Sequence, residues 1–154
     1  MAKENTEDLM KFLEPFPENI KETALWMRDF VWDLYPKANE LIYDNYNALA
    51  FGWSPTEKMS HIFCSVAAYR SGKNLHFGFY WGSQIKDPKK MLLGEGNQYR
   101  YLLITKKEDL PKTYVKQLLK EAFTNSLMKV KDPKQIVHGK TITKSVSAKK
   151  RRTK

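Results

Sequence analysis

The stretch that decides the fold is HIFCSVAAYRSGKNLHFGFYWG, residues 61–82. It holds two runs rich in aromatic and β-branched residues, 61–70 and 75–82, on either side of Ser-Gly-Lys-Asn at 71–74. Two such runs around a short glycine-containing turn are typical of a β-hairpin. We therefore expect the chain to fold around an antiparallel pair of strands.

A turn centred on residues 72–73 predicts the register of this hairpin and places Tyr69 opposite His76. Because side chains alternate between the two faces of a strand, one face then collects only apolar residues. We expect this face to pack on helices and to bury Cys64 as an unreactive thiol. Its members are Ile62, Cys64, Val66, Ala68, Leu75, Phe77, Phe79 and Trp81.

The opposite face of the hairpin is mixed, and it is our candidate ligand site. Hydroxyl and imidazole groups stand there beside small residues, and Ala67 and Gly78 are expected to leave room above the sheet. A shallow cleft of this kind holds a small ligand by stacking and hydrogen bonding. The alternative is a sheet face without a ligand, either partly solvated or covered by a loop. The candidate site residues are His61, Tyr69, His76 and Tyr80.

Helical patterns flank the hairpin on both sides. The strongest lies between Pro17 and Pro36, where apolar residues recur every three or four positions without an internal Gly or Pro. Asp109 is placed to cap the last helix. The order of elements predicts a single α+β domain with a mostly antiparallel sheet packed against helices. The predicted helices span 6–13, 18–35, 86–93 and 110–128, and further strands are predicted within 39–53 and at 99–105.

Length and composition agree with one domain. The chain has 154 residues, of which 42% are hydrophobic and 29% charged, enough for one core. A single cysteine, Cys64, excludes an internal disulfide. No run approaches the roughly 20 apolar residues of a membrane span, and residues 1–6 lack the pattern of a signal peptide. We therefore expect a cytoplasmic protein.

The positive charge is concentrated near the C-terminus. Residues 129–154 hold ten of the 27 Lys and Arg residues and one of the 17 acids, so they carry +9 of the net +10. They show no helical apolar stripe, which predicts a disordered basic tail after a folded domain at 1–128. Such a tail binds nucleic acid or another polyanion through phosphate contacts, or serves only solubility. The candidate polyanion-binding residues are Lys149, Lys150, Arg151 and Arg152.

No complete catalytic or metal-binding motif is found. His61 and Cys64 lie three residues apart, which on a strand sends them to opposite faces, so they do not form a nucleophile and base. His61 and His76 lack a third metal ligand. The patterns favour a protein that is not an enzyme and has no metal site.

Three stretches are similar to a known family. They are the strands at 62–70 and 75–80, the segment DPKKMLLGEGNQYRY at 87–101, and Asp-Leu-Pro at 109–111. In these, and in the order of elements over about residues 6–127, the chain resembles the YdhG-like family of small bacterial domains, part of which is described as frataxin-like iron chaperones. The resemblance implies an α+β bacterial domain without family-wide catalytic residues. The chain differs from the family at two places. Family members often have a Gly-Met-Pro step at the position of residues 45–49, and often have Lys-Ser or Lys-Gly at the position of residues 97–98.

Together these patterns predict a non-enzymatic binding or interaction module without a resident cofactor. Three kinds of partner remain open: a small ligand on the mixed face, a nucleic acid or other polyanion on the tail, and iron carried as by a frataxin-like chaperone. The positions of Trp26, Trp32 and Trp81 leave open a homodimer contact or burial in the monomer core.

Overall fold

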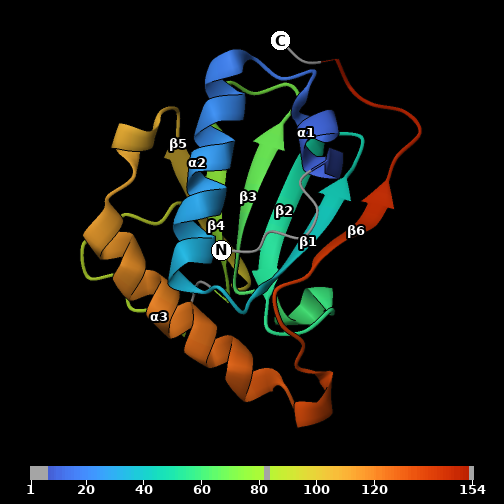
Figure 1. Cartoon of the computed structure of the whole chain (residues 1–154). Helices are drawn as coiled ribbons and strands as arrows, with labels where there is room; N and C mark the ends of the chain where they lie inside the picture. Colours follow the sequence, from blue (N-terminus) through green and yellow to red (C-terminus); the bar gives the residue numbers. More distant parts are fainter. Residues whose placement is uncertain (1–6, 82–83, 153–154) are drawn as a thin grey trace.

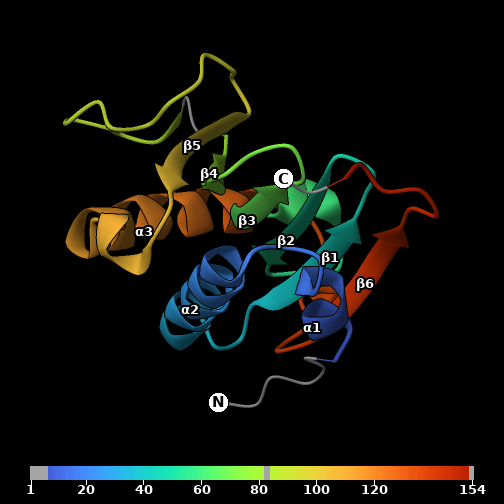
Figure 2. The ribbon, with the colours of Figure 1, turned by 90° about the horizontal axis from the view of Figure 1, so that it is seen from above.

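One sheet of six strands is covered on one face by three α-helices in the part of the chain that the computed structural model describes, residues 7–81 and 84–152 (Figures 1 and 2). The predicted α+β class is confirmed. The helices are α1 (Glu7–Leu13), α2 (Glu18–Leu34) and α3 (Lys112–Lys129), with short 3-10 helices η1 (Met59–His61), η3 (Lys107–Asp109) and η4 (Pro133–Gln135). The strands are β1 (Asn39–Asp44), β2 (Ala48–Ser54), β3 (Cys64–Tyr69), β4 (Leu75–Tyr80), β5 (Tyr99–Ile104) and β6 (Thr141–Val146).

The sheet has the strand order β5-β4-β3-β2-β1-β6. Strands β1 to β5 pair antiparallel with their neighbours in the chain, and β6 pairs parallel with β1. The sheet is therefore mostly antiparallel, as predicted, with one parallel edge built by the last part of the chain.

The apolar face of the central hairpin forms the core. Val66 and Phe77 are fully buried there, together with the inward side of α2 at Met27 and Val31. Cys64 is fully buried as well, and burial raises the pKa of its thiol well above the ordinary value of 9.0. The expected burial of Cys64 is confirmed, and a raised thiol pKa agrees with the low reactivity expected for it.

The three tryptophans in question take different positions. Trp32 is fully buried, and its Nε1–H donates to the Ala38 carbonyl at 2.8 Å, which places it in the monomer core. Trp26 and Trp81 are half-buried. Lysine ammonium groups lie over their rings, Lys112 at 5.4 Å from the centroid of Trp26 and Lys129 at 4.7 Å from that of Trp81.

The hairpin register differs from the prediction by two residues. Ala68, and not Tyr69, is the last residue of β3 with a partner in β4, namely Leu75. The strand continues toward β2 instead, because the Arg70 amide donates to the Asn47 carbonyl at 2.8 Å. This lengthens the turn between β3 and β4. Since a shift of two preserves the alternation of faces, the predicted faces are kept within β3 and β4. Before β3 the alternation fails, because Ile62 lies against Gly52 on the face away from the helices, whereas Phe63 is part of the core.

Two predictions for the segment before α3 are wrong: the helix at 86–93 and the α3 cap at Asp109. Residues 86–93 form no helix: the Asp87 carboxylate accepts hydrogen bonds from the amides of residues 91–92 and from the Tyr114 hydroxyl, which fixes a turn. Asp109 does not cap α3, because its carboxylate accepts from the amides of residues 105–106. In both cases the carboxylate binds backbone amides outside an α-helix: Asp87 those of a turn, and Asp109 those at the start of η3.

The prediction of a disordered tail after residue 128 is also wrong. Residues 133–135 form η4, and β6 lies beside β1 with Glu40 opposite Thr141. The reason lies in β1, which buries polar side chains that the C-terminal segment satisfies. Asn39 donates to the Val137 carbonyl at 2.8 Å and accepts from the Lys140 amide at 3.0 Å. The folded domain therefore extends past the predicted boundary.

A buried ion pair joins α2 to β1. The Arg28 guanidinium donates to both oxygens of Glu40 at 2.7 Å, and the side chains are 2% and 0% exposed. Thr141 of β6 adds a hydrogen bond to the same carboxylate at 3.2 Å. Bidentate geometry and a third donor offset the cost of removing both charges from water.

Replacing Arg28 by Met should lower the free energy of unfolding by about 3–5 kcal/mol, because it leaves the Glu40 carboxylate buried without a cation. The double variant Arg28→Met/Glu40→Leu should recover most of this loss, since neither charge is then buried. Urea denaturation of the three proteins measures both values. A single variant as stable as the wild type would contradict this account of α2 docking.

Candidate functional site

The face of the sheet opposite the helices, here called the outer face, carries the candidate site. In Figure 2, α1 and α2 lie below the strands, and residues 84–98 rise above β5. Helix α3 packs into the same core as α2 and so lies on their side of the sheet. The strand registers place on the outer face Tyr43, Ala50, Ser65, Ala67, Tyr69, His76, Gly78, Tyr80, Tyr99 and Tyr101.

Five aromatic rings follow one another across this face, and we call them the ring ladder. Ring centroids lie 4.6 Å apart for Tyr69 and His76, and 4.3 Å apart for His76 and Tyr101. The ladder continues from Tyr101 to Tyr99 at 5.8 Å and from Tyr99 to Tyr80 at 5.5 Å. These spacings are those of favourable aromatic pairs. The ladder thus spans β3, β4 and β5.

The cleft expected above Gly78 and Ala67 is filled. A Cβ at Gly78 would lie 2.2 Å from Cε1 of Tyr99, so the tyrosine ring occupies the space that this glycine leaves. Ala67 and Ser65 are only 6% and 3% exposed. The outer face therefore presents rings to solvent, with Tyr69 the most open at 39%.

Three of the four predicted ligand residues, Tyr69, His76 and Tyr80, lie in the ring ladder, and His61 does not. His61 ends η1, three residues before β3 begins, so it never enters the alternation of the strand. Its Nδ1 pairs with the Thr56 hydroxyl at 2.7 Å, and burial lowers its pKa. We therefore remove His61 from the candidate site.

The prediction missed Tyr43, Tyr99 and Tyr101. Tyr99 and Tyr101 alternate along β5 in the sequence Tyr-Arg-Tyr, which indicates that they share one face of a strand. The sequence does not say that β5 pairs with β4, and this pairing alone brings them beside His76 and Tyr80. Tyr43 needs two further strand pairings before it lies on the same face.

Burial favours the neutral form of four titratable side chains of the outer face. Burial lowers the pKa of His76 from its ordinary value of 6.5, which favours the neutral imidazole. Burial also raises the pKa of Tyr43, Tyr80 and Tyr99 from the ordinary 10.0, so their phenols keep their protons. The surface that results is aromatic and polar without net charge.

Two polar atoms of this face lack a hydrogen-bond partner among the described residues. They are the Tyr43 hydroxyl and Nδ1 of His76, both buried. The registers place these residues in one row across the sheet, with Ala50 and Ala67 between them. A buried polar atom without a partner costs about 1–3 kcal/mol. Both atoms are therefore unpaired hydrogen-bonding groups, and a molecule on the outer face would reach them only after the side chains that cover them move.

The second candidate site lies at one end of the sheet, and we call it the basic end. It consists of the predicted polyanion-binding residues Lys149, Lys150, Arg151 and Arg152. The Ser147 amide donates to the Asp44 carbonyl at 2.8 Å, and the Arg151 amide to the Tyr46 carbonyl at 2.9 Å. Figure 1 shows the chain after β6 crossing the end of the sheet toward β3.

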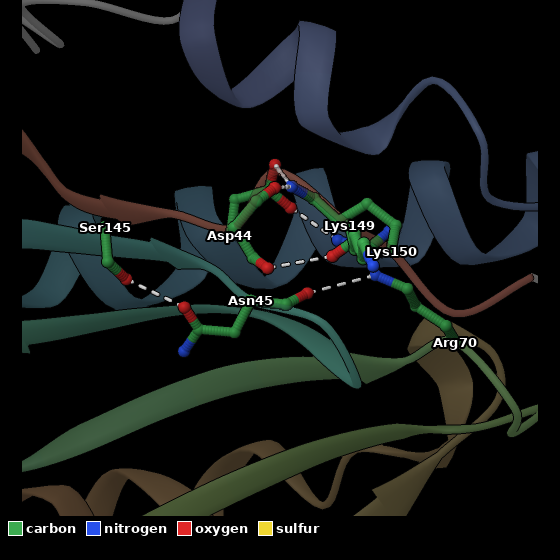
Figure 3. Close-up of polar contacts among 7 residues, drawn as sticks. Asp44, Asn45, Arg70, Ser145, Lys149 and Lys150 are labelled. Atoms are coloured by element: carbon green, nitrogen blue, oxygen red, sulfur yellow. Dashed lines mark hydrogen bonds and ion pairs between the residues drawn. The ribbon is translucent and has the colours of Figure 1, made fainter.

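A carboxylate shared by two cations anchors the basic end. Asp44 accepts from Arg70 at 2.5 Å and lies 3.4 Å from the Lys150 ammonium (Figure 3). Arg70 also donates to the Asn45 carbonyl at 3.2 Å, and the Asn45 side chain accepts from the Ser145 hydroxyl at 2.8 Å. One acid against two cations leaves this end positive, with Arg151 and Arg152 exposed beside it.

Neither a metal cluster nor a membrane-spanning helix occurs within residues 7–81 and 84–152. No three His, Cys, Asp or Glu side chains gather there in a way that would hold a metal ion. No helix of that part is both long and apolar enough to cross a membrane.

Comparison with protein-family models, curated proteins and solved structures finds no match for this chain. The resemblance to YdhG-like domains therefore stays a prediction.

The folding stability should depend on His76 in a defined pH window. Because the folded pKa is below 6.5, the unfolded chain takes up the proton first as the pH falls. The contribution of neutral His76 is complete well above pH 6.5 and is lost as the pH falls from 6.5 through the folded pKa. Replacing His76 by Phe keeps a ring between Tyr69 and Tyr101 and removes this titration.

Urea denaturation of wild type and His76→Phe between about pH 8 and pH 5 measures this effect. The difference between their free energies of unfolding should be constant at the alkaline end and shift in favour of the variant toward the acid end. A difference that is constant over the whole range would contradict a lowered pKa.

Proposed function

We propose that this protein is a non-enzymatic binding module that holds planar ligands of the nucleobase type on its outer face. The single observation that carries the proposal is the ring ladder, five consecutive rings with centroids 4.3–5.8 Å apart. Stacking on such rings binds any base, since every base has a π-face.

The outer face also holds two unpaired polar atoms, which a stacked base would reach after a rearrangement of the side chains that cover them. A nucleobase carries donors and acceptors on its edge, and the Tyr43 hydroxyl and His76 Nδ1 are buried atoms without partners. The absence of charge on the phenols and the imidazole suits a neutral ring better than an anionic one. The outer face therefore supports recognition of the base, not of a phosphate.

Adenosine, which has a base and no phosphate, tests this proposal. NMR titration should show saturable shifts of the ring-ladder residues. Tyr69→Ala should weaken binding about fivefold or more, because a stacked ring is worth about 1–3 kcal/mol per base. The matched control is Tyr46→Ala, since Tyr46 is 45% exposed and lies outside the ladder. Absence of saturable shifts, or equal losses in both variants, would refute the proposal.

A second candidate, single-stranded nucleic acid, is favoured by the position of the basic end. Tyr69 opens the ring ladder at the same end of the sheet, because it pairs with Ala48 just beyond the Tyr46 turn. A single nucleic acid strand could then place its phosphates at the basic end and its bases on the ring ladder. This combination of a basic surface with aromatic rings is typical of single-strand binding.

The salt dependence of binding to a 12-nucleotide thymidine oligomer tests this candidate. Removing 129–154 is unsuitable, since it deletes β6, so Lys149→Gln, Arg151→Gln and Arg152→Gln are combined. The slope of log affinity against log salt should fall by about 0.7 for each phosphate that the variant no longer neutralises. The control removes three lysines from α1 and α3, Lys11, Lys116 and Lys120. An unchanged slope, or the same fall in the control, would contradict a role for the basic end.

The iron-chaperone hypothesis gains no support from the described residues, where carboxylates and imidazoles do not gather. It stays a prediction of the family resemblance, and anaerobic ferrous titration tests it.

A further inference from the structure

A pocket of about 380 Å³ lies where the C-terminal ends of α2 and α3 meet the segment that leads into β6. Figure 1 shows these three segments together at one end of the molecule, below the sheet. The pocket is separate from the outer face, because its walls come from the helical side. Its apolar lining includes Leu34, Tyr35, Phe123, Leu127, Ile136 and Val137.

Aromatic rings give the pocket a fixed floor. The ring centroids of Tyr35 and Phe123 lie 4.8 Å apart, and both rings pack on Phe63, at 5.4 and 5.1 Å. Phe63 is only 1% exposed, so the floor is part of the core. A rigid floor means that a ligand would find the site already shaped.

The rim of the pocket exposes apolar side chains. Leu34 and Leu127 are each 37% exposed, and Ile136 is 36% exposed. Three such residues around one opening form a local apolar patch instead of the scattered exposure that is ordinary on a protein surface.

The backbone around the pocket offers few hydrogen bonds to a ligand, because its groups are already paired. The Val137 amide donates to the Pro55 carbonyl at 3.2 Å, and the Val137 carbonyl accepts from Asn39 at 2.8 Å. The Lys37 carbonyl accepts from the Gly139 amide at 3.0 Å. The body of a ligand must therefore be apolar.

Two lining residues supply the polar chemistry. Lys37 brings a cation and His138 an imidazole, and both are exposed at the edge of the pocket. Among the described residues, no carboxylate lies within ion-pair distance of either. An apolar wall beside an unpaired cation is complementary to an amphiphilic anion.

We propose that this pocket binds a carboxylic acid with a compact apolar body, such as a medium-chain fatty acid. The acyl chain lies on the Tyr35 and Phe123 rings, and the carboxylate meets Lys37 and His138 at the rim. The volume is at the lower end of the range of about 300–1,000 Å³ found for small-molecule sites, which suits a short chain. This inference is independent of the outer face.

Octanoate is the probe, with 1-octanol and octylammonium as neutral and cationic controls of the same chain. Methyl NMR titration should show saturable shifts at Leu34, Leu127 and Val137, with octanoate binding tightest. Shortening the chain to hexanoate should weaken binding about fourfold for each methylene removed. Absence of saturation, equal binding of the three probes, or shifts confined to other residues would overturn the proposal.

Variants locate the two halves of the ligand. Leu127→Asp should weaken octanoate binding about tenfold or more, because it places an acid on the apolar wall. Its control is Met10→Asp on α1, an apolar position that is more open, at 50% exposure. Lys37→Gln should weaken octanoate about two- to fivefold and leave octanol unchanged, with Lys131→Gln as control. Unchanged affinity in Leu127→Asp, or loss of both probes in Lys37→Gln, would contradict the assignment.

Discussion

A buried carboxylate is stable only with a cation and hydrogen bonds around it. Strand β1 carries two such carboxylates. Glu40 binds Arg28 of α2, and Asp44 binds Arg70 at the end of β3. Each carboxylate also contacts the C-terminal segment, Glu40 through Thr141 and Asp44 through Lys150. The position of α2, the end of the central hairpin and the docking of β6 all depend on these two charges. A sixth strand that looks dispensable by composition is thereby part of the domain.

The same arrangement determines what the two faces of the sheet become. With α1, α2 and α3 packed on one side, the tyrosines and His76 of the other side stay partly in contact with solvent. Neighbouring strands bring those rings within stacking distance, and the small residues between them are covered rather than hollow, since Tyr99 fills the space above Gly78. The result is a surface of rings whose polar groups are neutral, next to an end of the sheet that is positive.

The positive charge near the C-terminus is therefore held in a defined position by the fold. Lys150 is bound to Asp44, and the backbone of Arg151 is bound to Tyr46, so the basic end is positioned by hydrogen bonds and is not a free polyelectrolyte. The segment before β6 has a second role, because Ile136, Val137 and His138 close one side of the apolar pocket between α2 and α3. Both features are made by residues that follow the last helix.

The sequence by itself determined the α+β class, the long helices, the alternation that separates the apolar from the mixed face within β3 and β4, and the burial of Cys64. These follow from local periodicity, which needs no knowledge of distant contacts. Only the tertiary structure decided the rest. The pairing of β5 with β4 brought Tyr99 and Tyr101 to His76, the turn at η1 removed His61, and the buried acids of β1 turned a polar tail into β6. Each of these depends on partners far apart in the chain, and a local pattern carries no information about which strand will be the neighbour of another.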